Sequence, residues 1–362
     1  MEEPNLDLTI DRLGPAKIKS PLQLSTEVGD MVANFVEDDE RILYDVSLRR
    51  CTECRDNGPN EEPLSFERAG PREHIYFDPS KLHVGVVTCG GLCPGINNVI
   101  RALVMELHYH YGVRRIHGFR YGFEGLVPEA GHEVLELTPD VVKDIHHDGG
   151  TILGSSRGPQ SAEAMVDCLD RMGIHLLFTI GGDGTQRGAL AIHEEITKRD
   201  LRISVIGIPK TIDNDIMLVE KTFGFETAFS IAIQAIRAAH VEAAGAPNGI
   251  GLVRLMGRHS GYIAATAAMA EPDVNCVLVP EVPFSLDGDN GLIDWLVRRL
   301  KRRGHAVIVV AEGAGQDLLD AKSNGHDPSG NVVLGDIGLF LKHHISAGLK
   351  ARGLTHSLKY ID

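Results

Sequence analysis

From Lys81 onward, short runs of apolar residues alternate with stretches of helical periodicity. Continuous apolar runs of this length predict parallel strands that are covered on both faces by helices. The expected strands are Leu82–Thr88, Ile116–Phe119, His175–Ile180, Ile203–Ile208, Ile250–Leu255, Cys276–Val279, Ala306–Val310 and Leu358–Ile361. Helical spacing is found at Val99–Tyr111, Ala189–Ile196 and Ile293–Arg303. The pattern therefore predicts an α/β fold.

Residues 1 to about 80 have a different pattern, in which charges, prolines and short apolar pieces show no sustained periodicity. We interpret them as an extension that packs on the main body or is partly disordered. The predicted strands are many for one sheet, so we divide the rest near residue 224. This gives an α/β domain at 81–224, a second at 225–362, and an active-site cleft between two Rossmann-like domains with mainly parallel sheets.

The composition narrows the class of protein. Of the 362 residues, 43% are hydrophobic and only 5% aromatic, which predicts an aliphatic core. A net charge of −14 argues against nonspecific binding to nucleic acid or to anionic membranes. No apolar run is long enough to span a membrane, and the acidic start lacks the features of a signal peptide, so we expect a cytoplasmic protein.

The six cysteines show no spacing typical of a disulfide framework. Cys51 and Cys54 resemble half of a zinc site, but no second pair of ligands follows them. We expect free thiols in a reducing compartment.

The segment Ile180–Gly188, with the sequence IGGDGTQRG, carries the strongest chemical signal. A glycine turn between a strand and a helix lets backbone N–H groups close on a phosphate. Asp183, in the middle of this turn, would repel that phosphate unless a divalent cation screened both charges. The segment predicts a magnesium-assisted nucleotide site, and a plain strand-to-helix turn is the alternative.

Other glycine turns follow the expected strands. Thr88–Asn97 is a second turn before a helix, and it is either a phosphate contact or a structural turn. Arg157 and Arg258 each lie between glycines, where a guanidinium could bind a phosphate through two hydrogen bonds. Taken alone, each of them is more often a surface arginine.

Carboxylates gather at two further strand ends. In Pro209–Asp215, strand alternation would point Asp213 and Asp215 the same way, together with Thr211. One carboxylate could accept a proton while the other helps to hold a cation, although an Asx-rich turn is the alternative. Glu312, after Ala306–Val310, could accept hydrogen bonds from sugar hydroxyls or cap the next turn.

In combination, these segments resemble one family. TCGGLCPGIN, GSSRG, GGDGTQRGA, PKTIDND, MGRHSG and AEGAG occur in the order found in phosphofructokinases, over roughly residues 81–362. Lys210, within PKTIDND, and the long N-terminal extension are similar to the plant and trypanosomatid ATP-dependent branch.

The resemblance implies ATP-dependent transfer of phosphate to the 1-hydroxyl of fructose 6-phosphate, by a homo-oligomer that is a tetramer in the family. Asp213 would be the base and Asp183 would hold Mg²⁺. The ATP contacts would be Gly91, Arg157, Gly158, Gly182, Asp183, Gly184 and Thr185. The sugar phosphate would be held by Thr211, Ile212, Asp213, Met256, Gly257, Arg258 and Glu312.

The resemblance also bears on the phosphate donor. Pyrophosphate-dependent relatives carry an aspartate at the position of Gly184, where a carboxylate would crowd and repel the α-phosphate of a nucleotide. Lys210 is shared with pyrophosphate users, but also with trypanosomatid ATP users. We therefore expect ATP, with pyrophosphate as the alternative donor.

Two positions depart from the family pattern. Gly249 stands where bacterial relatives have an arginine that reaches a neighbouring subunit. The family also continues past the position of Asp362 with arginines that bind the sugar phosphate. For residues 1–362 we expect binding of MgATP with little turnover of fructose 6-phosphate. A catalytically incompetent or regulatory chain is an alternative function. Lipid and NAD kinases share the GGDGT turn, but PKTIDND and MGRHSG are not expected in them.

Overall fold

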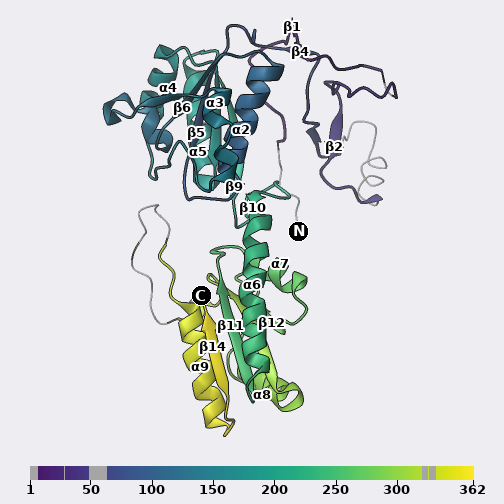
Figure 1. Ribbon diagram of the computed structural model, residues 1–362, viewed down its shortest axis with the longest axis vertical. Coiled ribbons are helices and arrows are strands. Elements are labelled where there is room, and N and C mark those ends of the chain that lie inside the picture. Colours follow the sequence, from purple (N-terminus) through teal and green to yellow (C-terminus); the bar gives the residue numbers. More distant parts are fainter. Residues whose placement is uncertain (1–6, 28, 49–62, 320–324, 326–331) are drawn as a thin grey trace.

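The computed structural model describes residues 7–27, 29–48, 63–319, 325 and 332–362. These residues form two lobes, one above the other, joined at a narrow waist (Figure 1). The upper lobe carries the N-terminal half of the chain, and the lower lobe begins with the long helix α6 (Phe225–Ala244).

The upper lobe is built on a six-stranded sheet with the strand order β10-β9-β8-β5-β6-β7. All neighbouring strands are parallel except β6 and β7, which form an antiparallel pair. The strands are β5 (His83–Thr88), β6 (Arg115–Phe119), β7 (Val134–Glu136), β8 (Leu176–Gly181), β9 (Ser204–Thr211) and β10 (Phe223–Gly224).

Helices cover both faces of this sheet. α2 and α3 pack with one buried cluster of aliphatic side chains, and α4 and α5 with another. The helical segments are α2 (Ile96–Met105), the π-helical turn η1 (Glu106–His110), α3 (Pro139–Val142), α4 (Ala162–Arg171) and α5 (Asp183–Lys198). The short 3₁₀ helices are η2 (Gly122–Leu126), η3 (Pro128–Ala130) and η4 (Ile145–His147). The central strands β5 and β8 are buried on both faces, so their sequences are almost continuously apolar.

The lower lobe contains a four-stranded parallel sheet with the order β12-β13-β11-β14. Its strands are β11 (Gly249–Leu255), β12 (Cys276–Leu278), β13 (His305–Ala311) and β14 (Ser357–Ile361). One face packs against α6 and α7 (Tyr262–Ala270). The other packs against α8 (Leu292–Arg303) and α9 (Ile337–Ala351), and the 3₁₀ helix η5 (Gln316–Leu318) follows β13.

The described part of the N-terminal extension packs mainly around the upper lobe. It holds two small antiparallel pairs, β1 (Ile18–Lys19) with β4 (His74–Ile75) and β2 (Arg41–Leu43) with β3 (Ser65–Glu67). The ring of Phe77 lies edge-on to that of His175, next to β8. These strands of two or three residues were not predicted, because such short pairs leave no periodicity in the sequence.

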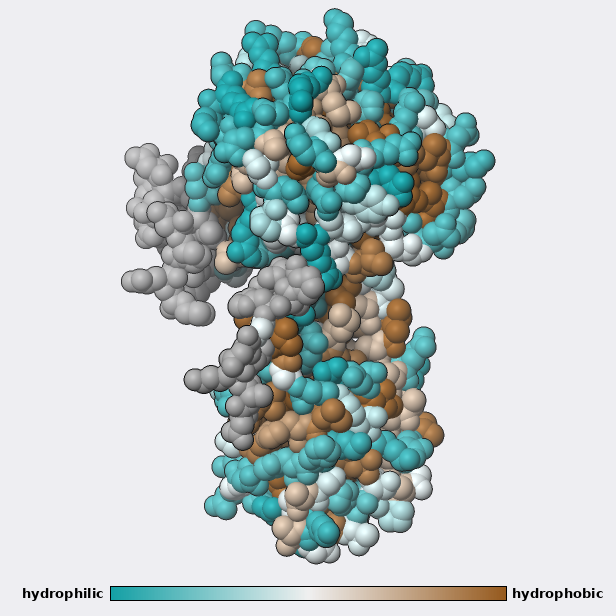
Figure 2. Space-filling model, turned by 90° about the vertical axis from the view of Figure 1, so that its left-hand side faces the viewer, coloured by the Kyte–Doolittle hydropathy of each residue, from teal (hydrophilic) through white to brown (hydrophobic). Residues whose placement is uncertain are grey.

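The surface differs between the lobes. In Figure 2 the upper lobe is mostly hydrophilic, whereas hydrophobic residues gather at the waist and over the lower lobe. Among the described helices, none is both long and apolar enough to cross a bilayer. Cys89, Cys93, Cys168 and Cys276 carry free thiols, while Cys51 and Cys54 lie outside the described residues.

The predicted fold class, α/β with mainly parallel sheets, is confirmed. All eight predicted strands are present with ends shifted by a few residues. The helix expected at Val99–Tyr111 begins earlier, at Ile96, because Gly95 adopts a left-handed conformation with φ 98° and caps it. The helix expected at Ala189–Ile196 begins six residues earlier, at Asp183.

Candidate active site

Two glycine-rich loops meet at the carboxyl edge of the upper sheet. The amide of Cys89, directly after β5, donates to the carbonyl of Ile180 in β8. The next residue, Gly90, donates to Ser156 O and accepts from Ser155 Oγ at 2.6 Å. The loop after β5 and the GSSRG loop are therefore held together. The chain leaves β5 and β8 toward opposite sides of the sheet, which is where ligands bind in open α/β sheets.

The GGDGT segment is a tighter structure than we predicted. Gly182 is the N-cap of α5, so Asp183 is the first residue of the helix and does not lie in the middle of a turn. β8 ends at Gly181 and α5 begins at Asp183, so Gly182 alone separates the strand from the helix. Asp183 is exposed and forms an ion pair with Arg187, one turn along α5. The first turn of α5 thus presents free backbone N–H groups and a carboxylate at the same edge.

Lys210 joins this edge from β9. Its side chain is only 5% exposed, and Nζ donates a hydrogen bond of 2.6 Å to Gly91 O. Burial lowers the pKa of Lys210 below its ordinary value. A Cβ placed on Gly91 would lie 3.6 Å from Nη2 of Arg157, so this arginine also reaches the Gly91 loop. Lys210 and Arg157 therefore place two cationic side chains beside one glycine loop.

The loop that follows β9, residues 211–222, is called the base loop below. β9 ends at Thr211, and Asn214 adopts a left-handed conformation with φ 55°, so strand alternation does not orient Asp213 and Asp215. Side chains close this loop on itself. Thr211 Oγ1 accepts from Asp213 N, and Asn214 Oδ1 accepts from Thr222 N. The predicted alternation of Asp213 and Asp215 is therefore wrong, because these local hydrogen bonds turn the chain away from an extended conformation.

The lower lobe contributes the segment 256–261, called the arginine turn below, and Glu312. Both follow neighbouring parallel strands, β11 and β13. Glu312 N donates to Leu255 O, and Gly313 N donates to Gly257 O at 3.1 Å. Gly257 has φ 129°, a conformation that favours glycine. Arg258 Nε lies 3.9 Å from Glu312 Oε1, so the two predicted sugar-phosphate residues lie side by side.

The base loop and the arginine turn meet at the waist. Ser260 Oγ donates a hydrogen bond of 2.6 Å to Asp213 O, across the two lobes. Burial raises the pKa of Asp213 to about 6, and the negative charges of Asp215 and Glu312 add to this effect. Arg258 and His259 act in the opposite direction. A carboxylate with this pKa is mostly ionised at neutral pH but is a stronger base than an exposed aspartate, which suits proton abstraction.

The other predicted residues fall into two groups. Gly158 and Gly184 face open space, and Met256 is exposed, so a ligand could reach all three. Thr185 is buried, and the side chain of Ile212 packs against the core of the upper lobe, so only the backbone of Ile212 is available to a ligand. Ser260 and Ser155 were missed as individual residues, since their partners are distant in sequence.

The donor set fits a magnesium ion that arrives with a nucleotide. Among the described residues, no group of three or more His, Cys, Asp or Glu side chains could hold a metal. Magnesium, however, usually takes only one or two protein carboxylates and completes its shell with water and substrate phosphates. Asp183 at the first turn of α5 offers such a carboxylate.

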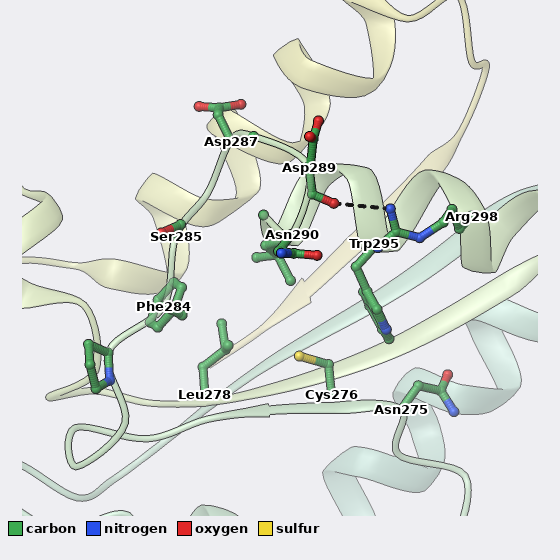
Figure 3. A pocket seen from close by; sticks show the side chains of 14 residues that line it. Asn275, Cys276, Leu278, Phe284, Ser285, Asp287, Asp289, Asn290, Trp295 and Arg298 are labelled. Atoms are coloured by element: carbon green, nitrogen blue, oxygen red, sulfur yellow. Dashed lines mark hydrogen bonds between the residues drawn. The ribbon is translucent and has the colours of Figure 1, made fainter.

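A separate cavity of about 750 Å³ lies in the lower lobe, away from these residues. It is bounded by the edge strand β12, the loop that follows it and α8 (Figure 3). Trp295 and Arg298 both come from α8, Cys276 comes from β12, and Arg298 donates to Asp289 O. None of the predicted site residues lines this cavity.

Comparison with known sequences agrees with this arrangement. The family profile described as "Phosphofructokinase" matches residues 83–357. An ATP-dependent 6-phosphofructokinase of Amycolatopsis methanolica is 49% identical over 98% of this chain and 78% of its own length. The protein of the same name from Borreliella burgdorferi is 48% identical, with coverages of 99% and 80%. That of Trypanosoma brucei brucei is 45% identical, with coverages of 98% and 72%.

Solved structures share the fold at lower sequence identity. A pyrophosphate-dependent phosphofructokinase from Marinobacter aquaeolei superposes with a TM-score of 0.61 at 20% identity, over 77% of this chain and 68% of that one. Phosphofructokinase from Pichia pastoris in the T-state gives 0.61 at 23% identity, over 83% and 32%. With the family profile spanning both sheets and relatives nearly half identical over almost its whole length, this chain belongs to the phosphofructokinase family.

Proposed function

We propose that the protein transfers the γ-phosphoryl group of ATP to the 1-hydroxyl of fructose 6-phosphate, giving fructose 1,6-bisphosphate and ADP. The observation that carries this proposal is the meeting of Asp213 with Arg258 and Glu312 at the waist, next to the glycine loops of the upper lobe. The names of relatives that are 44–49% identical support ATP as the donor. They also favour an active enzyme over the catalytically incompetent chain and the low turnover expected from the sequence.

In this proposal Asp213 accepts the proton of the 1-hydroxyl as the new P–O bond forms. Thr211 and Ile212 from the base loop, together with Met256, Gly257, Arg258 and Glu312, hold the sugar phosphate. Arg258 suits the 6-phosphate because its guanidinium can donate two parallel hydrogen bonds to phosphate oxygens. Phosphoryl transfer depends mostly on such positioning and on charge stabilisation.

The nucleotide would lie on the upper lobe, against the loops around Gly91 and Arg157–Gly158 and the first turn of α5, Gly182–Thr185. Free N–H groups at the start of α5 are suited to phosphate oxygens. Asp183 would hold a magnesium ion, which when bound neutralises part of the phosphate charge. Lys210 would add a positive charge near the transferred group, since it lies beside the Gly91 loop.

Gly184 supports ATP rather than pyrophosphate. A Cβ at Gly184 would meet no atom within 4 Å, so the glycine leaves open space above the start of α5. The α-phosphate of a nucleotide needs such space, whereas a pyrophosphate donor does not. Use of pyrophosphate is the second candidate, which the buried Lys210 alone favours.

The assembly and the location are also proposals. We expect a homo-oligomer, a tetramer by resemblance, whose mass light scattering would measure. The cytoplasmic location stays a prediction, and one plant relative, 44% identical, is named as chloroplastic.

The experiment that tests the proposed function is a steady-state assay of the full-length protein. ADP formation is followed with ATP and fructose 6-phosphate, and the same mixture is assayed with pyrophosphate in place of ATP. We expect ADP formation that requires the sugar phosphate, and a much lower rate with pyrophosphate. A protein that prefers pyrophosphate, or that hydrolyses ATP equally well without the sugar, would contradict the proposal.

A further inference from the structure

Ser260 connects the two halves of the site. It lies in the arginine turn of the lower lobe, is 4% exposed, and donates its 2.6 Å hydrogen bond to the main-chain oxygen of Asp213 in the upper lobe. Loss of a hydrogen bond from a buried side chain is unfavourable, so this contact stabilises the observed position of the base loop.

Both ends of this contact are themselves fixed. On the lower lobe, Gly261 N donates to Glu281 Oε1 at 2.7 Å. The arginine turn is folded so closely that a Cβ on Gly257 would lie 2.4 Å from Ser260 O. On the upper lobe, Thr222 Oγ1 donates to Thr211 O at 2.7 Å. The hydroxyl of Ser260 is therefore a rigid link between two loops that are each internally bonded.

The hydrogen bond from Ser260 lies at the point where the position of Asp213 relative to Arg258 and Glu312 is set. Asp213 comes from one lobe, whereas Arg258 and Glu312 come from the other, and the charges of all three interact. A shift of the base loop by a fraction of an ångström would change both the reach of the carboxylate and the amount of water around it. Small misplacements of a reacting group lower turnover strongly.

We propose that Ser260 is a positioning residue for Asp213, because its hydroxyl locks the base loop of the upper lobe onto the arginine turn of the lower lobe. This inference rests on the proposed function of Asp213 as the base. Ser260 itself touches neither the sugar nor the nucleotide in this account. It acts through the main chain of the residue that does.

The test compares Ser260→Ala with Ser230→Ala in the full-length protein. Ser230 is the control for loss of a serine hydroxyl: its Oγ also donates a 2.6 Å bond to a main-chain oxygen, that of Glu226, but it is exposed and lies within α6. Ser260→Ala is expected to lower kcat about 5- to 50-fold, the size expected for loss of one buried hydrogen bond. KM for ATP should stay within about 2-fold, because the proposed nucleotide contacts lie on the upper lobe.

Two further readouts separate positioning from a general loss of structure. Amide hydrogen exchange should become faster in residues 211–222, while β8 keeps its wild-type protection. The acid limb of the pH–rate profile should move to lower pH, because water entering the loosened loop relieves the burial that raises the pKa of Asp213. Ser260→Cys, similar in size but a weak donor, should change all readouts in the same direction by less.

The outcomes are distinct. Wild-type kcat and wild-type exchange in Ser260→Ala would overturn the inference, and so would a lower kcat with unchanged exchange and pH profile. If Asp213→Asn retained wild-type turnover, the proposed base itself would fail. If Asp213→Asn were inactive while Ser260→Ala behaved like Ser230→Ala, only the role of Ser260 would fail.

Discussion

Asp213 is the residue on which the proposed chemistry of the site depends most. Its carboxyl is partly buried, and the negative charges of Asp215 and Glu312 act on its pKa against the positive charges of Arg258 and His259. Placing a carboxylate there is unfavourable for folding, and strain of this kind is typical of catalytic groups. The free energy of unfolding and the rate of turnover can be measured separately in variants of Asp213.

The first prediction concerns turnover. Asp213→Asn keeps the shape of the side chain but removes the base, so kcat should fall by about 10²- to 10⁴-fold. Affinity for ATP, measured by calorimetry, should change little. A variant that folds, binds ATP and turns over at nearly the wild-type rate would contradict the role of Asp213.

The second prediction concerns pH. The unprotonated carboxylate is the active form, so kcat/KM should rise with pH through about 6, the pKa of Asp213. Because folding raises this pKa, the contribution of Asp213 to stability is fully present below its ordinary pKa of 3.8 and is lost as pH rises through about 6.

The sign of that linkage gives a stability test. At pH 8, Asp213→Asn should be more stable than the wild type by up to about 3 kcal/mol, since one pKa unit corresponds to about 1.4 kcal/mol. The difference should shrink as the pH falls below about 6. Urea unfolding at several pH values measures this difference in the free energy of unfolding. A variant that is less stable than the wild type at pH 8 would show that the ionised carboxylate of Asp213 does not destabilise the fold.

Among the secondary structure elements, the start of α5 carries the proposed contacts to the phosphate donor and to the metal. Asp183 and Gly184 both lie in its first turn, next to the loop that holds Lys210. Negative charge is favourable at a helix N-terminus, so substitutions here can change ligand binding without weakening the helix.

The third prediction concerns Gly184, where a substitution should affect ATP binding but not the stability of the helix. Gly184→Asp should leave the melting temperature unchanged or slightly higher, while affinity for ATP falls about 10-fold or more through repulsion of the phosphates. Gly184→Ala, which adds a methyl group to open space without charge, is the control and should bind ATP nearly as well as the wild type. Equal affinity in all three proteins, measured by titration calorimetry, would show that position 184 does not face the nucleotide.

The fourth prediction concerns the metal. Asp183→Asn should raise the magnesium concentration needed for half-maximal ATP binding about 10-fold, because a charged ligand is replaced by a neutral one. Arg187→Gln removes the ion-pair partner of Asp183 and should leave that concentration the same or lower it. An unchanged magnesium requirement in Asp183→Asn would place the ion elsewhere.

How far the sequence predicts these elements depends on their length and burial. The central strands β5, β8, β11 and β13 were predicted because each is a short, continuous apolar run between helical segments, which is typical of a buried parallel strand. The start of α5 was missed because Asp183, Gly184 and Thr185 do not follow an apolar period. The hydrogen bond from Ser260 to Asp213 could not be predicted, since it joins residues 47 positions apart on different lobes.

At the scale of the whole molecule, the site is divided between two sheets that meet at the waist (Figure 1). The proposed nucleotide contacts lie at residues 91–185, within the upper lobe, whereas Arg258 and Glu312 belong to the lower one. Binding of the two substrates should therefore be separable by mutation.

The fifth prediction uses this separation. Arg258→Ala should weaken binding of fructose 6-phosphate about 10- to 100-fold, the loss expected for charge-assisted hydrogen bonds. Affinity for MgATP should remain within about 2-fold of the wild type, because Arg258 does not contact the upper glycine loops in this account. Comparable losses for both ligands in calorimetry would show that the two halves do not bind independently.

The most direct test of the central proposal is the identity of the products. The full-length protein is incubated with ATP, magnesium and fructose 6-phosphate, and the mixture is followed by phosphorus NMR. The account predicts that ATP is converted to ADP while an equal amount of phosphate ester appears at the 1-position of the sugar, and that Asp213→Asn forms it far more slowly. Release of inorganic phosphate without a new ester, or phosphorylation that proceeds with pyrophosphate but not with ATP, would contradict it.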